Sequence, residues 1–299
     1  MKSYFSFIAA GLAAQLIFAA LPAAAQTTSA ATAQAVVEAV QMPAWVDRGG
    51  ASIPLAPGMQ LRDYDRLRTG ANAKLLLKMA EGSLVKMGEN GRLELDQMGL
   101  GKDRVFNAAL NVFRGAFRFT TDVLGRPRRR NINISVATVT AGIRGTDVWG
   151  KADVGRDIVC LIEGKIEVQR GRDQPIVMDQ AMSFYIAPRG APPQPVAPVD
   201  PKQLEIWAAE TEIDTGKGAA RRGGKWKVVA ASVETQADAL RLYDALRAAG
   251  YAAEIRPAKD GEKIIYRVRL AHLPSKLEAD ALAAAIRGKM GVVEPRVSM

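Results

Sequence analysis

The sequence predicts an all-β N-terminal domain, of the sandwich, barrel or solenoid type, followed by a smaller α+β domain. Three observations predict this order. Short runs of alternating apolar and polar residues recur between residues 36 and 186, with turn residues between them. A proline- and glycine-rich stretch over residues 187–224 follows. Residues 225–299 then alternate strand-like with helix-like segments, which marks a second domain.

Two turns organise the clearest strands of the first domain. Glu81-Gly82 separates the apolar runs 73–78 and 83–87, and Asn90-Gly91 precedes the alternating run 92–96. Asn-Gly between such runs is a strong hairpin signal, so we expect the strands on either side of it to pair. Cys160 lies within an apolar strand and is expected to be a buried, unreactive thiol.

Residues 187–224 are predicted to be a linker that carries one short acidic helix. Five prolines in residues 187–200 favour an extended spacer. Asp200 then fits an N-cap and Pro201 a first helical turn, so a helix is expected over residues 201–213. The glycine-rich residues 214–224 are expected to form a second, flexible linker.

The last domain is predicted to fold in the order βαββαβ. Strands are expected over residues 226–233, 251–256, 264–270 and 291–297, and helices over residues 235–249 and 275–287. This order places two helices on one face of a four-stranded antiparallel sheet and leaves the other face open.

Strand alternation predicts which side chains occupy the open face. We expect Val228, Ala230, Val268 and Leu270 to pack toward the helices. We expect Lys227, Val229, Ala231, Arg267 and Arg269 to point outward. Such cationic side chains can hydrogen-bond sugar hydroxyls or carboxylates, and they are also typical of a merely solvated sheet face.

The N-terminus predicts export. Lys2 precedes an apolar run from Phe5 to Leu21, and small residues at Ala23 and Ala25 fit a signal peptidase, so residues 1–25 are expected to be a signal peptide. An uncleaved membrane anchor is the alternative. Residues 26–35 are expected to be a flexible arm. No second run of spanning length follows, so we expect a periplasmic protein without a transmembrane domain in the mature chain.

Composition narrows the function classes. The formal net charge of +10 favours polyanionic partners, and an exported chain is expected to meet cell-envelope polymers rather than nucleic acid. One cysteine and one histidine exclude an intramolecular disulfide, a multi-cysteine zinc site and a two-histidine metal site. No catalytic motif is present, and we expect neither an enzyme nor a cofactor.

The first domain resembles the periplasmic FecR domain. The resemblance rests on the motifs 58–61, 65–70, 80–83 and 161–168, and on the stretch 139–149 with its Ile143-Arg144-Gly145-Thr146-Asp147 centre. It implies a β-rich extracytoplasmic domain, a sandwich or solenoid, that senses or scaffolds without catalytic residues. The plain structural interpretation of Arg-Gly-Thr-Asp is a glycine-flanked turn.

Residues 225–299 resemble a SPOR (sporulation-related repeat) domain. The resemblance rests on the βαββαβ order, on Ala249-Gly250-Tyr251 and on the stretch 266–269. It implies a ferredoxin-like fold that binds peptidoglycan glycan strands stripped of their stem peptides. The binding residues expected from the open face and from the resemblance are Lys227, Ser232, Arg267 and Arg269.

The sequence therefore predicts a non-enzymatic cell-envelope protein whose FecR-like domain is tethered to peptidoglycan by its SPOR-like domain, and it associates the protein with cell division. The main alternative is a regulator of an extracytoplasmic sigma/anti-sigma system that acts through an envelope or inner-membrane protein partner. Two further alternatives remain open. One is a glycan-cleaving enzyme, and the other is RNA binding by the C-terminal sheet, which export disfavours.

Overall fold

The computed structural model describes residues 34–101, 105–121, 130–143 and 145–299. The expected signal peptide over residues 1–25 lies outside this part of the chain, as does all but the end of the expected arm over residues 26–35. Within the described ranges, no helix combines the length and the apolar character needed to cross a bilayer.

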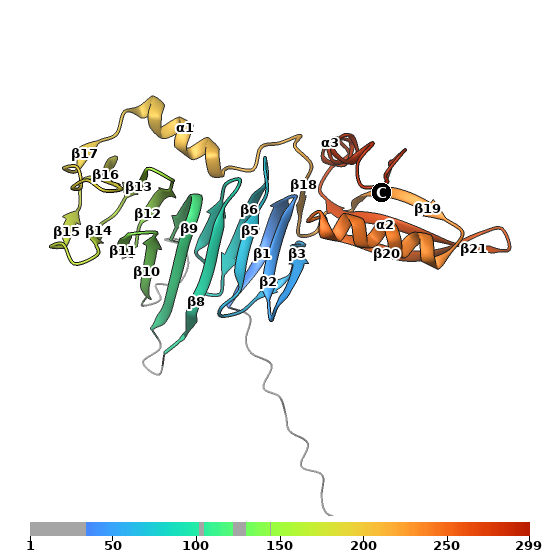
Figure 1. Ribbon diagram of the computed structural model, residues 1–299, viewed down its shortest axis with the longest axis horizontal. Coiled ribbons are helices and arrows are strands. Elements are labelled where there is room, and N and C mark those ends of the chain that lie inside the picture. Colours follow the sequence, from blue (N-terminus) through green and yellow to red (C-terminus); the bar gives the residue numbers. More distant parts are fainter. Residues whose placement is uncertain (1–33, 102–104, 122–129, 144) are drawn as a thin grey trace, which may run out of the picture. The chain divides into compact units, whose positions relative to one another are not determined.

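The strands of the first domain form two sheets joined by one long strand, β9 (Figure 1). Sheet A runs in the order β1 (Ala35–Gln41), β6 (Lys74–Met79), β7 (Leu84–Met87), β9 (Phe106–Thr120), β12 (Asp147–Ala152), β13 (Arg156–Glu163), β16 (Ser183–Pro188) and β17 (Ala197–Pro198). Sheet B runs in the order β3 (Ala51–Pro54), β2 (Ala44–Arg48), β5 (Arg66–Thr69), β8 (Arg92–Leu100), β9, β10 (Arg130–Val136), β11 (Val139–Ile143), β14 (Ile166–Arg170) and β15 (Ile176–Met178). Only the β9–β10 pairing is parallel among them.

Strand β9 belongs to both sheets because it changes sheet at Gly115. Arg114 pairs with β8 in sheet B, and Gly115 pairs with Ala152 in sheet A. Gly115 has a φ of +85°, and a Cβ atom there would lie 2.7 Å from the Cα atom of Gly91. Glycine is therefore required at this crossing by both its backbone angle and the space around it.

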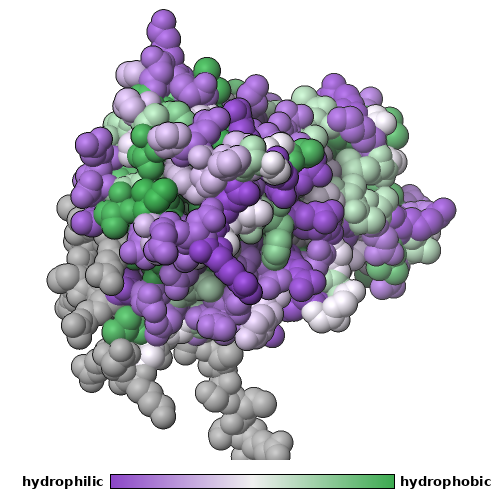
Figure 2. Space-filling view, turned by 60° about the vertical axis from the view of Figure 1, so that its left-hand side comes forward, coloured by the Kyte–Doolittle hydropathy of each residue, from purple (hydrophilic) through white to green (hydrophobic). Residues whose placement is uncertain are grey.

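The main core lies between the two sheets. Leu110 and Val112 of sheet B belong to the same buried cluster as Phe117 and Phe119 of sheet A, although all four lie on β9. The face of the molecule in Figure 2 is mainly hydrophilic, and its hydrophobic residues form separate groups. This is the distribution expected when alternate residues of each strand are buried.

The hairpin prediction at Asn90-Gly91 is wrong. Strand β7 pairs with β6 and β9 in sheet A, whereas β8 pairs with β5 and β9 in sheet B. The turn therefore carries the chain from one sheet to the other. The Glu81-Gly82 turn, by contrast, does join the paired strands β6 and β7.

The segment after the first domain is held by specific contacts. Helix α1 (Pro201–Thr211) begins as predicted, with the Asp200 side chain accepting hydrogen bonds from the backbone N–H groups of Lys202 and Gln203. Within residues 214–224, expected to be flexible, β18 (Ala219–Arg221) pairs with the end of β1. On the same side of β1, β4 (Gln60–Leu61) pairs with Ala35 and Val36. A linker rich in glycine is thus held in an extended conformation by backbone hydrogen bonds.

The C-terminal region is a four-stranded antiparallel sheet with two helices. The sheet order is β20 (Ala253–Asp260), β21 (Lys263–Leu273), β19 (Trp226–Val233) and β22 (Arg296–Ser298). Helices α2 (Gln236–Ala248) and α3 (Lys276–Ile286) begin at the N-caps Thr235 and Ser275, whose side chains accept hydrogen bonds from backbone N–H groups. Val228, Ala230, Val268 and Leu270 are buried, as the alternation predicted.

A carboxylate of α3 fixes the chain that leads into this sheet. Glu278 accepts hydrogen bonds from the backbone N–H groups of Gly216 at 2.7 Å, Gly218 at 2.7 Å and Ala219 at 3.0 Å. The Glu278 side chain is buried, so these three donors replace the water that a carboxylate would otherwise bind.

Candidate functional site

The open face of the C-terminal sheet carries a row of exposed polar side chains that crosses three strands. Arg267 of β21 pairs with Arg256 of β20 on one side and with Ser232 of β19 on the other. Residues directly opposite each other in adjacent strands share a face. All three side chains are exposed, so they form one continuous polar row.

A second row lies beside the first and crosses four strands. Arg269 of β21 pairs with Glu254 and Val229, and Val229 pairs in turn with Arg296 of β22. Glu254 forms ion pairs with Arg256 at 3.1 Å and with Arg269 at 3.2 Å. Arg269 is half-buried, and its Nε atom has no hydrogen-bond partner among the described residues.

The charge state of Glu254 follows from these contacts. Burial acts to raise the pKa of Glu254, but the hydrogen bond from Arg269 and the charge and hydrogen bond of Arg256 outweigh burial and lower the pKa. The carboxylate therefore stays ionised at neutral pH and holds two guanidinium groups in place.

We call the two rows together with Lys227 the cationic sheet surface. Its members are Lys227, Ser232, Glu254, Arg256, Arg267, Arg269 and Arg296. Five cationic side chains against one carboxylate give this surface a net charge of +4. Guanidinium groups in fixed positions can donate paired hydrogen bonds to carboxylates and single bonds to hydroxyls.

The structure brings together the four residues predicted from the sequence, Lys227, Ser232, Arg267 and Arg269, on one face. The expected outward position of Ala231 is wrong, because a β-bulge between Val229 and Ala231 places Ala231 opposite the buried Val268. After the bulge, Ser232 takes the outward position beside Arg267.

Sequence reasoning missed Arg256, Arg296 and Glu254. The alternation of side chains within the predicted strand 251–256 already placed Glu254 and Arg256 on one face. Which residues of the next strand lie beside them, Arg269 and Arg267, depends on the register of the β20–β21 hairpin. Arg296 lies on a strand of three residues, whose register no sequence pattern specifies.

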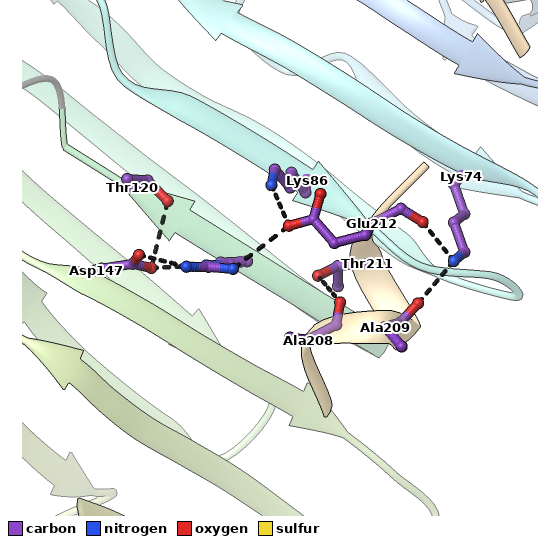
Figure 3. A network of polar contacts seen from close by, with 9 residues as sticks. Lys74, Lys86, Thr120, Asp147, Ala208, Ala209, Thr211 and Glu212 are labelled. Carbon is purple, nitrogen blue, oxygen red and sulfur yellow. Dashed lines mark hydrogen bonds and ion pairs between the residues drawn. The ribbon is translucent and has the colours of Figure 1, made fainter. Parts of the chain in front are cut away.

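The Arg-Gly-Thr-Asp motif of the first domain has a structural role at its last residue. Asp147 accepts hydrogen bonds from Arg118 Nε at 2.9 Å and Nη2 at 2.6 Å, and from Thr120 Oγ1 at 3.3 Å (Figure 3). The hydrogen bonds to Asp147 raise the pKa of Arg118 against the opposing effect of burial. Arg144, the other charged residue of the motif, lies outside the described residues.

Cys160 is buried within sheet A, as predicted. Burial, with a smaller effect of the Asp147 charge, raises the pKa of the thiol to about 12. We expect a thiol reagent such as Ellman's reagent to leave the native protein unlabelled at mildly alkaline pH, because the reactive thiolate is almost absent. The same protein should react fully in denaturant, and rapid labelling of the folded chain would contradict this prediction.

Metal binding finds no support in the described residues, where no three His, Cys, Asp or Glu side chains gather closely enough to hold an ion.

Two family models match separate parts of the chain. Residues 65–167 match the family model "FecR protein", and residues 223–295 match the family model "SPOR domain". The chain therefore carries a FecR region followed by a SPOR domain, which confirms the resemblance predicted from the sequence. Both are families of non-catalytic domains found in cell-envelope proteins.

No curated protein matches the chain in sequence. Two crystal structures, each described as a "putative anti-sigma factor" from Parabacteroides distasonis, are similar to it, both with a TM-score of 0.40. The first is 11% identical and covers 67% of this chain and 98% of its own. The second is 14% identical and covers 74% of this chain and 89% of its own.

Proposed function

We propose that this chain is a non-enzymatic periplasmic protein that binds peptidoglycan glycan strands through its SPOR domain and holds its FecR region, a sensor or scaffold, at the cell wall. The observation that carries the proposal is the cationic sheet surface. Two adjacent rows of it expose Arg256, Arg267 and Arg296, whose side chains are directed away from the helices. The βαββαβ order and the antiparallel sheet support a ferredoxin-like fold for this domain.

The surface chemistry suits a glycan chain from which the peptides have been removed. Removal of a stem peptide leaves the lactyl group of the sugar as a free carboxylate. Guanidinium groups bind such carboxylates through charge-assisted hydrogen bonds, and Ser232 offers a hydroxyl for neighbouring sugar hydroxyls. Arg269 has a supporting role, since its side chain is half-buried and paired with Glu254.

Sedimentation with purified cell-wall sacculi tests the proposal. We expect the full chain to co-sediment, and the variant Arg267→Glu/Arg296→Glu to bind at least about tenfold more weakly, because two charge-assisted contacts of roughly 1.5–3 kcal/mol each are replaced by repulsion. Sacculi treated with an amidase to remove stem peptides should bind more protein than untreated sacculi.

The matched control is Arg241→Glu/Lys276→Glu, which changes the net charge equally on helices α2 and α3. This control should bind like the parent chain. If both variants lose binding equally, the interaction is a general effect of net charge and the cationic sheet surface is not the binding site.

The FecR region supports a second candidate, a regulator of an extracytoplasmic sigma/anti-sigma system that acts through a membrane partner. Co-purification of the protein from membranes with one inner-membrane regulator, unaffected by Arg267→Glu/Arg296→Glu, would favour this candidate.

A further inference from the structure

The outer face of sheet A has a row of side chains that contains both cationic and apolar residues. Register places Lys86, Arg118, Trp149, Cys160 and Phe184 side by side across strands β7, β9, β12, β13 and β16. This face points away from the main core, because Val148 next to Trp149 belongs to that core. The first two members of the row are cationic, and the other three are apolar.

Helix α1 covers this row. Trp207 stacks on Trp149 with ring centroids 4.8 Å apart and an interplanar angle of 7°, and Phe184 meets Trp207 edge-on at 5.8 Å. These residues form a buried cluster of their own, separate from the main core. Trp149 is fully buried, and the Trp207 ring of α1 covers it from outside the sheet.

The charges of α1 and of the face beneath it are complementary. Glu210 forms an ion pair with Lys151 at 2.8 Å. Glu212, the C-cap of α1, contacts both Lys86 and Arg118 (Figure 3). Lys86, Lys151 and Arg118 thus each face a carboxylate of α1 or of its C-cap, and Arg118 is also held by Asp147.

The C-terminus of α1 has its own partner. Lys74 Nζ donates hydrogen bonds to the backbone carbonyls of Ala209, at 2.6 Å, and Glu212 (Figure 3). The last carbonyls of a helix have no partner within the helix and carry the negative end of its dipole. Sheet A therefore contacts three features of α1, namely an aromatic side chain, two carboxylates and a helix C-terminus.

Two observations indicate that the contacts between α1 and sheet A are incomplete and that α1 can leave the sheet without unfolding it. Trp149 Nε1 is buried without a hydrogen-bond acceptor among the described residues. The chain before α1 is itself the proline-rich spacer of residues 187–200, and it is held to sheet A by β17, a strand of only two residues, and by a backbone hydrogen bond from Val199 to Met182. No residue of α1 belongs to the main core between the sheets.

We propose that this face of sheet A is a docking surface for an acidic helix of a partner protein, and that α1 occupies it in the absence of that partner. The partner helix has the pattern of α1, in which Trp207 is followed by Glu210 and then by Glu212 at the end of the helix. It therefore carries an aromatic residue, one carboxylate three residues later, and a second carboxylate at its C-terminus, five residues after the aromatic residue. An acceptor for Trp149 Nε1 would give the partner an advantage over α1. This inference does not depend on glycan binding.

A peptide of residues 198–214 is the probe. The variant Trp207→Ala/Glu212→Lys removes two anchors of α1 and leaves the sheet face unchanged, so the labelled peptide is expected to bind it at least tenfold more tightly than the parent chain. The control variant, Glu205→Lys/Ile206→Ala, changes exposed positions of α1 and should bind like the parent. Peptide binding to the opened variant should weaken as salt is added.

Several outcomes would overturn the inference. The face is no docking surface if the opened variant, folded by circular dichroism, binds the peptide no better than the control variant. Equal binding of a peptide with Trp207→Ala, Glu210→Lys and Glu212→Lys would show that the contact is not selective. A dimer of the parent chain that the peptide dissociates would assign the face to the α1 helix of a second copy, and not to a partner protein.

Discussion

Trp149→Ala is expected to lower the free energy of unfolding by about 3–5 kcal/mol, the usual cost of truncating a large buried aromatic residue. Trp149 is fully buried between sheet A and α1, and its ring stacks on Trp207. Its loss leaves a cavity on the outer face of sheet A and removes the main apolar contact of the helix. Urea unfolding followed by far-ultraviolet circular dichroism measures the change without relying on tryptophan fluorescence.

The control for this prediction is Ile206→Ala on the same helix. Ile206 is 59% exposed, so its truncation is expected to change stability by less than about 0.5 kcal/mol. A loss below about 1 kcal/mol for Trp149→Ala would mean that α1 contributes little to the stability of sheet A, and that water fills the space at low cost.

Gly115→Val is expected to destabilise the first domain by at least about 3 kcal/mol. A β-branched residue is strained at a φ of +85°, and its Cβ atom would overlap the backbone at Gly91, 2.7 Å away. Because Gly115 is the point where β9 passes between the sheets, the strain acts on both. Thermal unfolding by circular dichroism gives the effect as a lowered Tm.

Gly99→Val provides the matched control. Gly99 lies on β8, has no positive φ, and has open space where its Cβ atom would be. The same substitution there should leave stability nearly unchanged. Equal losses at both positions would trace the effect to β-branching in general, and would contradict the special role of the β9 crossing.

The elements of the C-terminal domain were predictable from sequence because their signals are local. The N-caps Thr235 and Ser275 and the turn at Asp260-Gly261 each depend on a few adjacent residues. The outward row was predictable up to the bulge at Val229/Ala231. A bulge changes strand parity without a sequence signal, which is why Ala231 was placed wrongly.

Sheet assignment in the first domain was not predictable in the same way. Asn90-Gly91 has the chemistry of a hairpin turn, but the same two residues also allow a turn that joins two sheets. A type I′ hairpin needs a positive φ at both residues, and here Asn90 has a φ of +52° while the φ of Gly91 is not positive. Which of the two occurs depends on partners far along the chain, such as β9 for both β7 and β8. The acidity of α1 was evident from sequence, yet its contacts with Lys86 and Lys151 depend on that same long-range pairing.

The pairing of β18 with β1 has a consequence for solubility. An uncovered outer strand presents free N–H and C=O groups that recruit strands from other molecules and start aggregation. In this chain β4 protects one end of β1 and β18 protects the other, at Ala39–Gln41. A chain cut before residue 219 would lose that protection, so the FecR region produced without the segment that follows it should self-associate even if its core is folded.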